Sequence, residues 1–289
     1  MPPRIVTVTI ILFWLTTTGA LVYYEVAPRF QAGEPPPFTI PLTAEVSTTS
    51  VDWNVLGKDG PIGKGTTRIS RGADHAYELS AEFKIDRFKV LFIELEDMKI
   101  KSEYGITDEG SLLRSSAHVK LIATKIPLIE IKSVPVEIDF TGVVKDHQFH
   151  SQLTGIVFGE TKSLELEPIP VSQSGSILNP MHLVHKISGL HTGRSWRIPL
   201  MDPMRAIPAT MRGLVPDKGQ LANELVATVR LEDLSLHGIT EACFKIDYTK
   251  PEEPRPLAAT WVRRRDDAVL QQWASYEGIE YTLQRARGQ

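Results

Sequence analysis

The sequence predicts a mainly β protein: a curved antiparallel sheet or half-barrel with a few short helices, preceded by one N-terminal transmembrane helix. Two observations predict this class. Many segments show the two-residue alternation of half-buried strands, and turn residues rather than helical periodicity separate them. A run of twenty uncharged residues precedes these segments. So many strands favour a sheet that curls, because flat open sheets rarely carry them.

The uncharged run covers residues 5–24, IVTVTIILFWLTTTGALVYY. At about 1.5 Å per residue, a helix of this length matches the hydrocarbon thickness of a bilayer. We expect residues 1–4 to be a short cytoplasmic tail and residues 5–24 to be a signal anchor. The protein would then cross the cell membrane once, with its folded domain outside the cytoplasm. A signal peptide cleaved near Ala20 is the alternative.

A proline-rich segment follows the predicted span. Residues 25–41 contain five prolines and little apolar periodicity, which predicts an extended, semi-rigid linker. The β-rich domain is expected from residue 42 to 289. Its strands are predicted at 50–56, 66–71, 76–85, 90–104, 117–126, 136–144 and 147–158, and in a second set at 194–201, 224–236, 242–249, 257–264, 268–278 and 280–286.

Turn residues mark the connections between these strands. Gly57, the pair Gly60-Pro61, Gly72, residues 108–110 and the pair Lys145-Asp146 separate the first set. Consecutive short strands without intervening helices favour antiparallel pairing over a βαβ arrangement.

A short helix is predicted between the two sets of strands. Asn179 suits an N-cap, Pro180 the first turn and Gly189 the stop, which gives about two turns. His182 and His185 would project from this helix away from its apolar stripe. Together with His191 they resemble a metal site, but a site needs three or four ligands with supporting groups. We therefore expect solvated histidines.

The remaining candidate residues indicate no catalytic or metal site. His147 and His150 would point to opposite faces of a strand. Ser195 lacks the G-x-S-x-G pattern of a hydrolase nucleophile, and Cys243 is expected to be a buried strand residue. Carboxylates that could form a glycosidase-type pair alternate with apolar residues, as on any half-solvated strand: Glu94, Glu96 and Asp97.

The charge of the chain bears on its partners. The formal net charge is −3 and the pI is near 6.3, which gives no overall attraction to nucleic acid or other polyanions. The run Arg263-Arg264-Arg265-Asp266-Asp267 predicts a charged hairpin turn, with a contact to anionic lipid headgroups as a secondary interpretation. No nucleotide-binding or metallopeptidase motif occurs, so we expect no cofactor and no metal.

Three segments resemble a family of poorly characterised bacterial envelope proteins. They are VDWNVLGKDGPIGKGTTRIS (51–70), GLHTGRSWRIPLMDP (189–203) and TWVRRRDDAVLQQWASYEGIEYTLQRA (260–286). The closing segment is also similar to the β regions of extracytoplasmic transglutaminase-like proteins, although their catalytic Cys, His and Asp have no match here. The resemblance implies a non-catalytic, curved β domain related to half-barrel lipoprotein carriers.

Two functions are compatible with this sequence. The first is a membrane-anchored, extracytoplasmic binding or scaffold protein of the cell envelope, which could hold an apolar ligand in its curved sheet. Its partners would be the membrane together with a lipid or an envelope protein. The alternative is a cell-envelope hydrolase whose site residues converge only in space.

Overall fold

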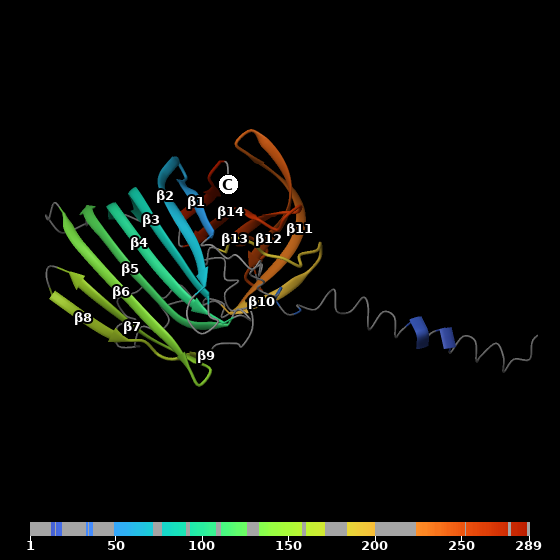
Figure 1. The fold of residues 1–289 in the computed structure, drawn as a ribbon, viewed down its shortest axis with the longest axis horizontal. Coiled ribbons are helices and arrows are strands. Elements are labelled where there is room, and N and C mark those ends of the chain that lie inside the picture. Colours follow the sequence, from blue (N-terminus) through green and yellow to red (C-terminus); the bar gives the residue numbers. More distant parts are fainter. Residues whose placement is uncertain are drawn as a thin grey trace, which may run out of the picture.

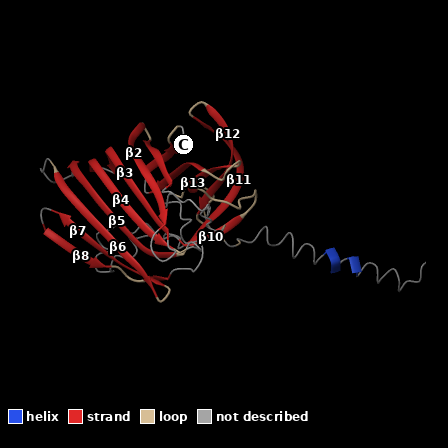
Figure 2. Ribbon diagram, in the orientation of Figure 1, coloured by secondary structure: helices blue, strands red, loops and turns tan. Residues whose placement is uncertain are grey.

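The part of the chain that forms the sheet begins at residue 49. The computed structural model describes residues 13–14, 16–18, 33, 35–36, 49–71, 77–90, 93–107, 111–125, 133–157, 160–170, 184–199, 224–251, 253–276 and 279–287. Figures 1 and 2 show that strands dominate this part of the molecule. The prediction of a mainly β, antiparallel fold is confirmed.

The strands fall into two groups along the chain. The first group is β1 (Thr49–Gly57), β2 (Gly60–Arg71), β3 (Tyr77–Val90), β4 (Ile93–Ile106), β5 (Leu112–Lys125), β6 (Val134–Lys145), β7 (Gln148–Val157), β8 (Glu160–Glu165) and β9 (Ile169–Pro170). The second is β10 (Ser195–Pro199), β11 (Glu224–Leu236), β12 (Ile239–Thr249), β13 (Pro256–Arg263), β14 (Val269–Tyr276) and β15 (Ile279–Arg285).

All fifteen strands belong to one sheet. Its order is β10-β11-β12-β13-β14-β15-β1-β2-β3-β4-β5-β6-β7-β8, and β9 pairs with β7 off this path. Each group is thus a meander of neighbouring strands. The two meanders join where the last strand, β15, pairs antiparallel with the first, β1, from Trp53 opposite Arg285 to Leu56 opposite Thr282.

One face of this sheet carries the main core and is called the core face here; the opposite face is the outer face. The main core cluster combines Val51 and Trp53 of β1 with Val229, Ile246 and Val262 of the second group. Residues from both meanders therefore pack together, which requires the sheet to curl around its core face, as Figure 1 shows.

The predicted strands match the observed ones, except that β8 and β9 were not predicted. Two hairpins turn on two residues in the left-handed region, at Asp146-His147 and at His237-Gly238, where φ is between 48° and 80°. Such turns match the twist of antiparallel strands and set their register. The turn predicted at Lys145-Asp146 is observed at Asp146-His147, one residue later. Residues 264–266 form the predicted charged turn.

The predicted helix at residues 179–189 is wrong for its second half. Residues 184–190 are not helical, and Lys186 instead makes an antiparallel bridge with Ala268. Val184, Ile187 and Leu190 pack into the main core. Segment 184–190 is extended because its neighbours supply backbone partners that a helix would have to give up. Residues 179–183 lie outside the described residues.

Little of the predicted anchor is described. Residues 13–14 and 16–18 are helical, whereas the rest of residues 1–32 lies outside the described residues. None of the described helical residues belongs to a helix with the length and apolar character that a bilayer span requires.

Candidate functional site

The core face has an apolar region that is only half buried. Strands β4 to β6 place partly buried hydrophobic side chains against the edge of the main core: Ile100, Val119, Leu121, Phe140 and Val144. On β7, Gly155 lies opposite Ile138 on the same face, and a Cβ atom built on Gly155 would meet no described atom within 4 Å. The core face therefore has room for an apolar group beside β6 and β7.

Three polar side chains in contact with one another, those of Trp53, Thr67 and His185, cross the buried part of the core face. The Trp53 indole N–H donates to Thr67 Oγ1 over 2.8 Å, and the same oxygen lies 2.7 Å from His185 Nε2. His185 is only 5% exposed. Burial lowers the pKa of His185 to about 4, and the charge of Arg285 adds to this shift. The imidazole is therefore neutral at pH 7.

His185 also ties the two meanders together. Its carbonyl oxygen accepts a hydrogen bond from Val269 N on β14, while its ring contacts Thr67 on β2. The sequence interpretation of His185 as a solvated histidine is wrong, because segment 184–190 is extended over the core face rather than helical and exposed.

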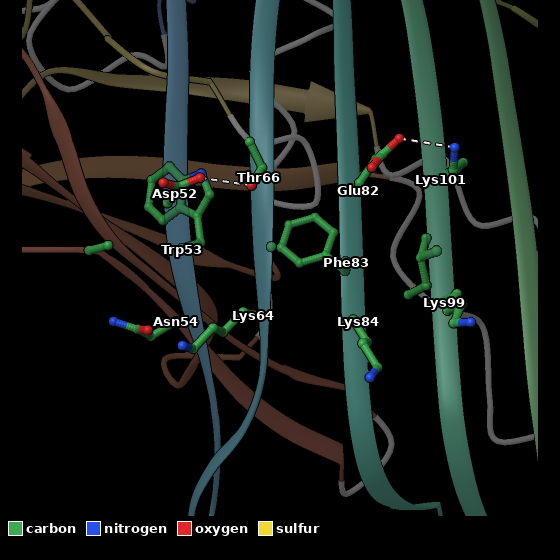
Figure 3. A pocket seen from close by; sticks show the side chains of 13 residues that line it. Asp52, Trp53, Asn54, Lys64, Thr66, Glu82, Phe83, Lys84, Lys99 and Lys101 are labelled. Atoms are coloured by element: carbon green, nitrogen blue, oxygen red, sulfur yellow. Dashed lines mark hydrogen bonds and ion pairs between the residues drawn. The ribbon is translucent and has the colours of Figure 1, made fainter.

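A trough of about 510 Å³ runs across β1 to β4 on the outer face. Two cross-strand rows of side chains form its walls, and the row between them contributes its backbone to the floor, because alternate residues point to opposite faces. The floor residues are Trp53, Gly65, Phe83 and Ile100. Figure 3 shows the side chains of both walls.

One wall of the trough contains carboxylates that already have partners. Thr66 Oγ1 donates to Asp52 Oδ1 over 2.7 Å, and Lys101 Nζ lies 3.0 Å from Glu82 Oε1 (Figure 3). Glu82 and Lys101 thus compensate each other's charge, and Thr66 donates to the carboxylate of Asp52.

The other wall is basic and contains Asn54, Lys64, Lys84 and Lys99. Lys120 on β5 continues this line of lysines beyond the trough, and the four lysines are called the lysine row. Lys64 stands opposite Lys84, Lys84 opposite Lys99, and Lys99 opposite Lys120, on β2, β3, β4 and β5. Figure 3 shows the first three side by side. All four are exposed. No local pattern in the sequence reveals this row, since the lysines lie 15 to 21 positions apart and only the strand register aligns them.

The outer face of the second meander carries a different charge arrangement, which we call the β11–β13 network. Lys245 Nζ lies 3.1 Å from Glu232 Oε1, 3.7 Å from Asp247 Oδ1 and 4.5 Å from the centre of the Trp261 ring. Arg230 Nε donates to Asp247 Oδ2 over 2.6 Å. Burial raises the pKa of Glu232, but hydrogen bonds from Lys245 and Trp261 outweigh it, so the pKa lies below its ordinary value.

The other candidate residues of the sequence analysis do not form a common site. Glu96 pairs with Arg87, Asp97 occupies a left-handed conformation at an irregularity between β4 and β5, and Ser195 accepts a hydrogen bond from Gly33 N with its carbonyl oxygen. Within the described part of the chain, no three His, Cys, Asp or Glu side chains gather as a metal site would require.

The prediction for Cys243 is confirmed. It is a free cysteine on β12 with 1% exposure, packed with Leu234 and Trp261. Burial raises the pKa of its thiol to about 11, so it is protonated at pH 7 and unsuited to nucleophilic attack.

Comparisons with known proteins show a distant structural likeness. No protein-family model matches the chain, and no curated protein matches it. A solved structure, a β-barrel-like protein of the domain of unknown function DUF1849 from Brucella abortus, is similar with a TM-score of 0.42 and 9% sequence identity. The match covers 88% of this chain and 97% of that one. The resemblance to transglutaminase-like proteins finds no support in these comparisons.

Proposed function

We propose that this chain is a membrane-anchored, extracytoplasmic binding protein of the cell envelope that holds an apolar ligand, such as a lipid chain, against its core face. The observation that carries the proposal is the half-buried apolar region of β4 to β7. It continues the main core, and Gly155 leaves room beside it. Apolar surface that stays partly exposed in a folded protein commonly marks a ligand or partner site.

The anchor and the location rest on the uncharged run of residues 5–24 and the proline-rich linker of residues 25–41. Carbonate extraction of membranes tests them: the full chain stays in the membrane pellet, whereas deletion of residues 1–37 releases it. Release of the full chain would contradict an anchor.

Native mass spectrometry of the full chain, released from a mild detergent, tests the ligand. We expect a lipid-sized adduct on the wild-type protein. The variant Gly155→Phe places a ring beside Ile138, where a Cβ meets no described atom within 4 Å, and should abolish the adduct. Gln152→Phe on the outer face of the same strand is the matched control and should keep it. A bare wild-type mass, or equal loss in both variants, would contradict the proposal and favour a scaffold role with a protein partner.

A further inference from the structure

We propose that the lysine row is a binding site for a linear polyanion, a chain whose carboxylate or phosphate groups repeat at about the spacing of adjacent strands. The polymer would lie along the lysine row, across β2 to β5, at the basic edge of the trough. This site is on the outer face, opposite the apolar region of the core face, so the inference does not rest on the proposed function.

The register of the lysines is the first argument. Three consecutive cross-strand pairs are Lys64–Lys84, Lys84–Lys99 and Lys99–Lys120, each directly opposite. Neighbouring strands lie about 4.8 Å apart, and like charges directly opposite one another destabilise a sheet. The row therefore costs free energy in the unbound protein, and a bound anion would remove that cost.

The availability of the lysines is the second argument. Lys64 and Lys99 have no ion pair with any residue that the structure describes. Lys84 lies 3.9 Å from Asp86, at the limit of an ion pair, and the two side chains are 61% and 75% exposed. Lys120 alone has a close partner, Glu137 at 2.9 Å. Among the described residues, Lys64 and Lys99 are thus free to meet an anion, and Lys84 has only a long, exposed ion pair to exchange.

The charges around the row define the shape of the ligand. The adjacent row holds Asp52 and the ion pair of Glu82 with Lys101. On the other side, Asp86 lies 3.9 Å from Lys84, and Glu96 pairs with Arg87. Because Lys101 and Arg87 are paired with carboxylates, the positive charge beside the trough that lacks a close carboxylate follows the lysine row, one side chain wide. A flat anionic membrane would touch the flanking carboxylates as well, whereas a linear polymer lying along the row would contact the lysines alone.

The floor of the trough argues against single-stranded nucleic acid. Nucleic-acid grooves of this kind combine basic groups with aromatic side chains on which bases stack. The two aromatic residues of the floor, Trp53 and Phe83, direct their rings to the core face, where Phe83 packs over Gly65. The ligand is therefore recognised by its charges and their spacing.

The experiment measures binding of four probes to the full chain in a non-ionic detergent. Long-chain polyphosphate and polygalacturonate represent the two sources of linear negative charge. Mixed micelles of phosphatidylglycerol in the same detergent and single-stranded DNA represent an anionic membrane surface and a nucleic acid. The variant Lys64→Gln/Lys84→Gln/Lys99→Gln removes three charges from the row. The control Lys58→Gln/Lys145→Gln/Lys162→Gln removes three exposed charges elsewhere, with the same change in net charge.

We expect the wild type to bind at least one linear probe and the row variant to bind it about 30-fold more weakly, with the slope of log K against log salt reduced by about two. The control should stay within twofold of the wild type. The preferred linear probe identifies phosphate or carboxylate as the ligand group. The proposal is overturned by wild-type binding to neither linear probe, by an equal loss in the control, or by stronger binding to phosphatidylglycerol micelles or DNA that the row variant loses. None of these outcomes bears on the apolar ligand of the core face.

Discussion

The outer faces of the two meanders use the same residue type in opposite ways. Lys245 in the β11–β13 network has a side chain that is only 14% exposed and is held by two carboxylates and a tryptophan ring. Lys84 in the lysine row is 61% exposed and faces other lysines. A mostly buried charge must be compensated within the fold, because its loss of water costs free energy. An exposed charge keeps its water and can be left for a partner.

On the core face, His185 joins the two meanders through its contacts with β14 and β2. Breaking this junction should have the largest effect on stability. The folded-state pKa of about 4 is lower than the ordinary value of 6.5. The stabilisation by the neutral ring is therefore present above pH 6.5 and is lost as the pH falls from 6.5 toward 4. The shift corresponds to about 3 kcal/mol in total.

Urea unfolding between pH 7.5 and pH 4.5 measures this effect. The wild type should keep its stability from pH 7.5 to about pH 6.5 and lose it progressively below that. His185→Gln should be less stable than the wild type at pH 7.5 but should lose much less on acidification, because the titrating group is gone. Parallel pH profiles for the two proteins would show that His185 is not the source.

The β11–β13 network should give the next largest effect. Lys245→Met keeps the length and apolar character of the side chain, but it removes one of the two cations, Lys245 and Arg230, that Glu232 and Asp247 share. We expect a loss of about 2 kcal/mol in the free energy of unfolding, since the group is mostly buried. Urea unfolding at pH 7 checks this. Lys84→Met is the matched control, and an equal loss there would remove the distinction between the two faces.

The lysine row should give the smallest effect, with the opposite sign. Lys99→Gln removes a charge that faces Lys84 on one side and Lys120 on the other. The unbound protein should become more stable by about 0.5 kcal/mol. The gain should shrink in high salt, where screening already weakens the repulsion. If Lys99→Gln were less stable than the wild type at low salt, Lys99 would stabilise the folded protein rather than repel its neighbours.

The sequence predicted most strands because alternation and turn residues are local signals. It missed β8, where ETKSLE has no regular apolar alternation. It also assigned a helix to the segment of His185, because spacing within the segment cannot reveal the backbone partners that Asp267 and Val269 supply from another part of the chain.

The register of the strands could not be predicted from the sequence either. The sequence indicates that Lys84, Lys99 and Lys120 are exposed, since each stands between two apolar residues, whereas Lys64 stands between two glycines. Their alignment depends on hairpin geometry and on the irregularities between β4 and β5. The net charge of −3 is a sum over the whole chain. It argued against overall attraction to polyanions, but it could not show that one row of the surface is strongly positive.

The pairing of β15 with β1 has a consequence for how the sheet is assembled. Each meander is built from neighbouring hairpins whose contacts are close in sequence, but the ladder between Trp53 and Arg285 closes a loop of more than two hundred residues. During synthesis, β1 has no partner on that side until the ribosome has passed residue 285. For most of translation, the edge of β1 that later pairs with β15 therefore has open backbone hydrogen-bonding groups. These groups have to be shielded from other chains until β15 is made, although in the folded structure they lie in the middle of the sheet.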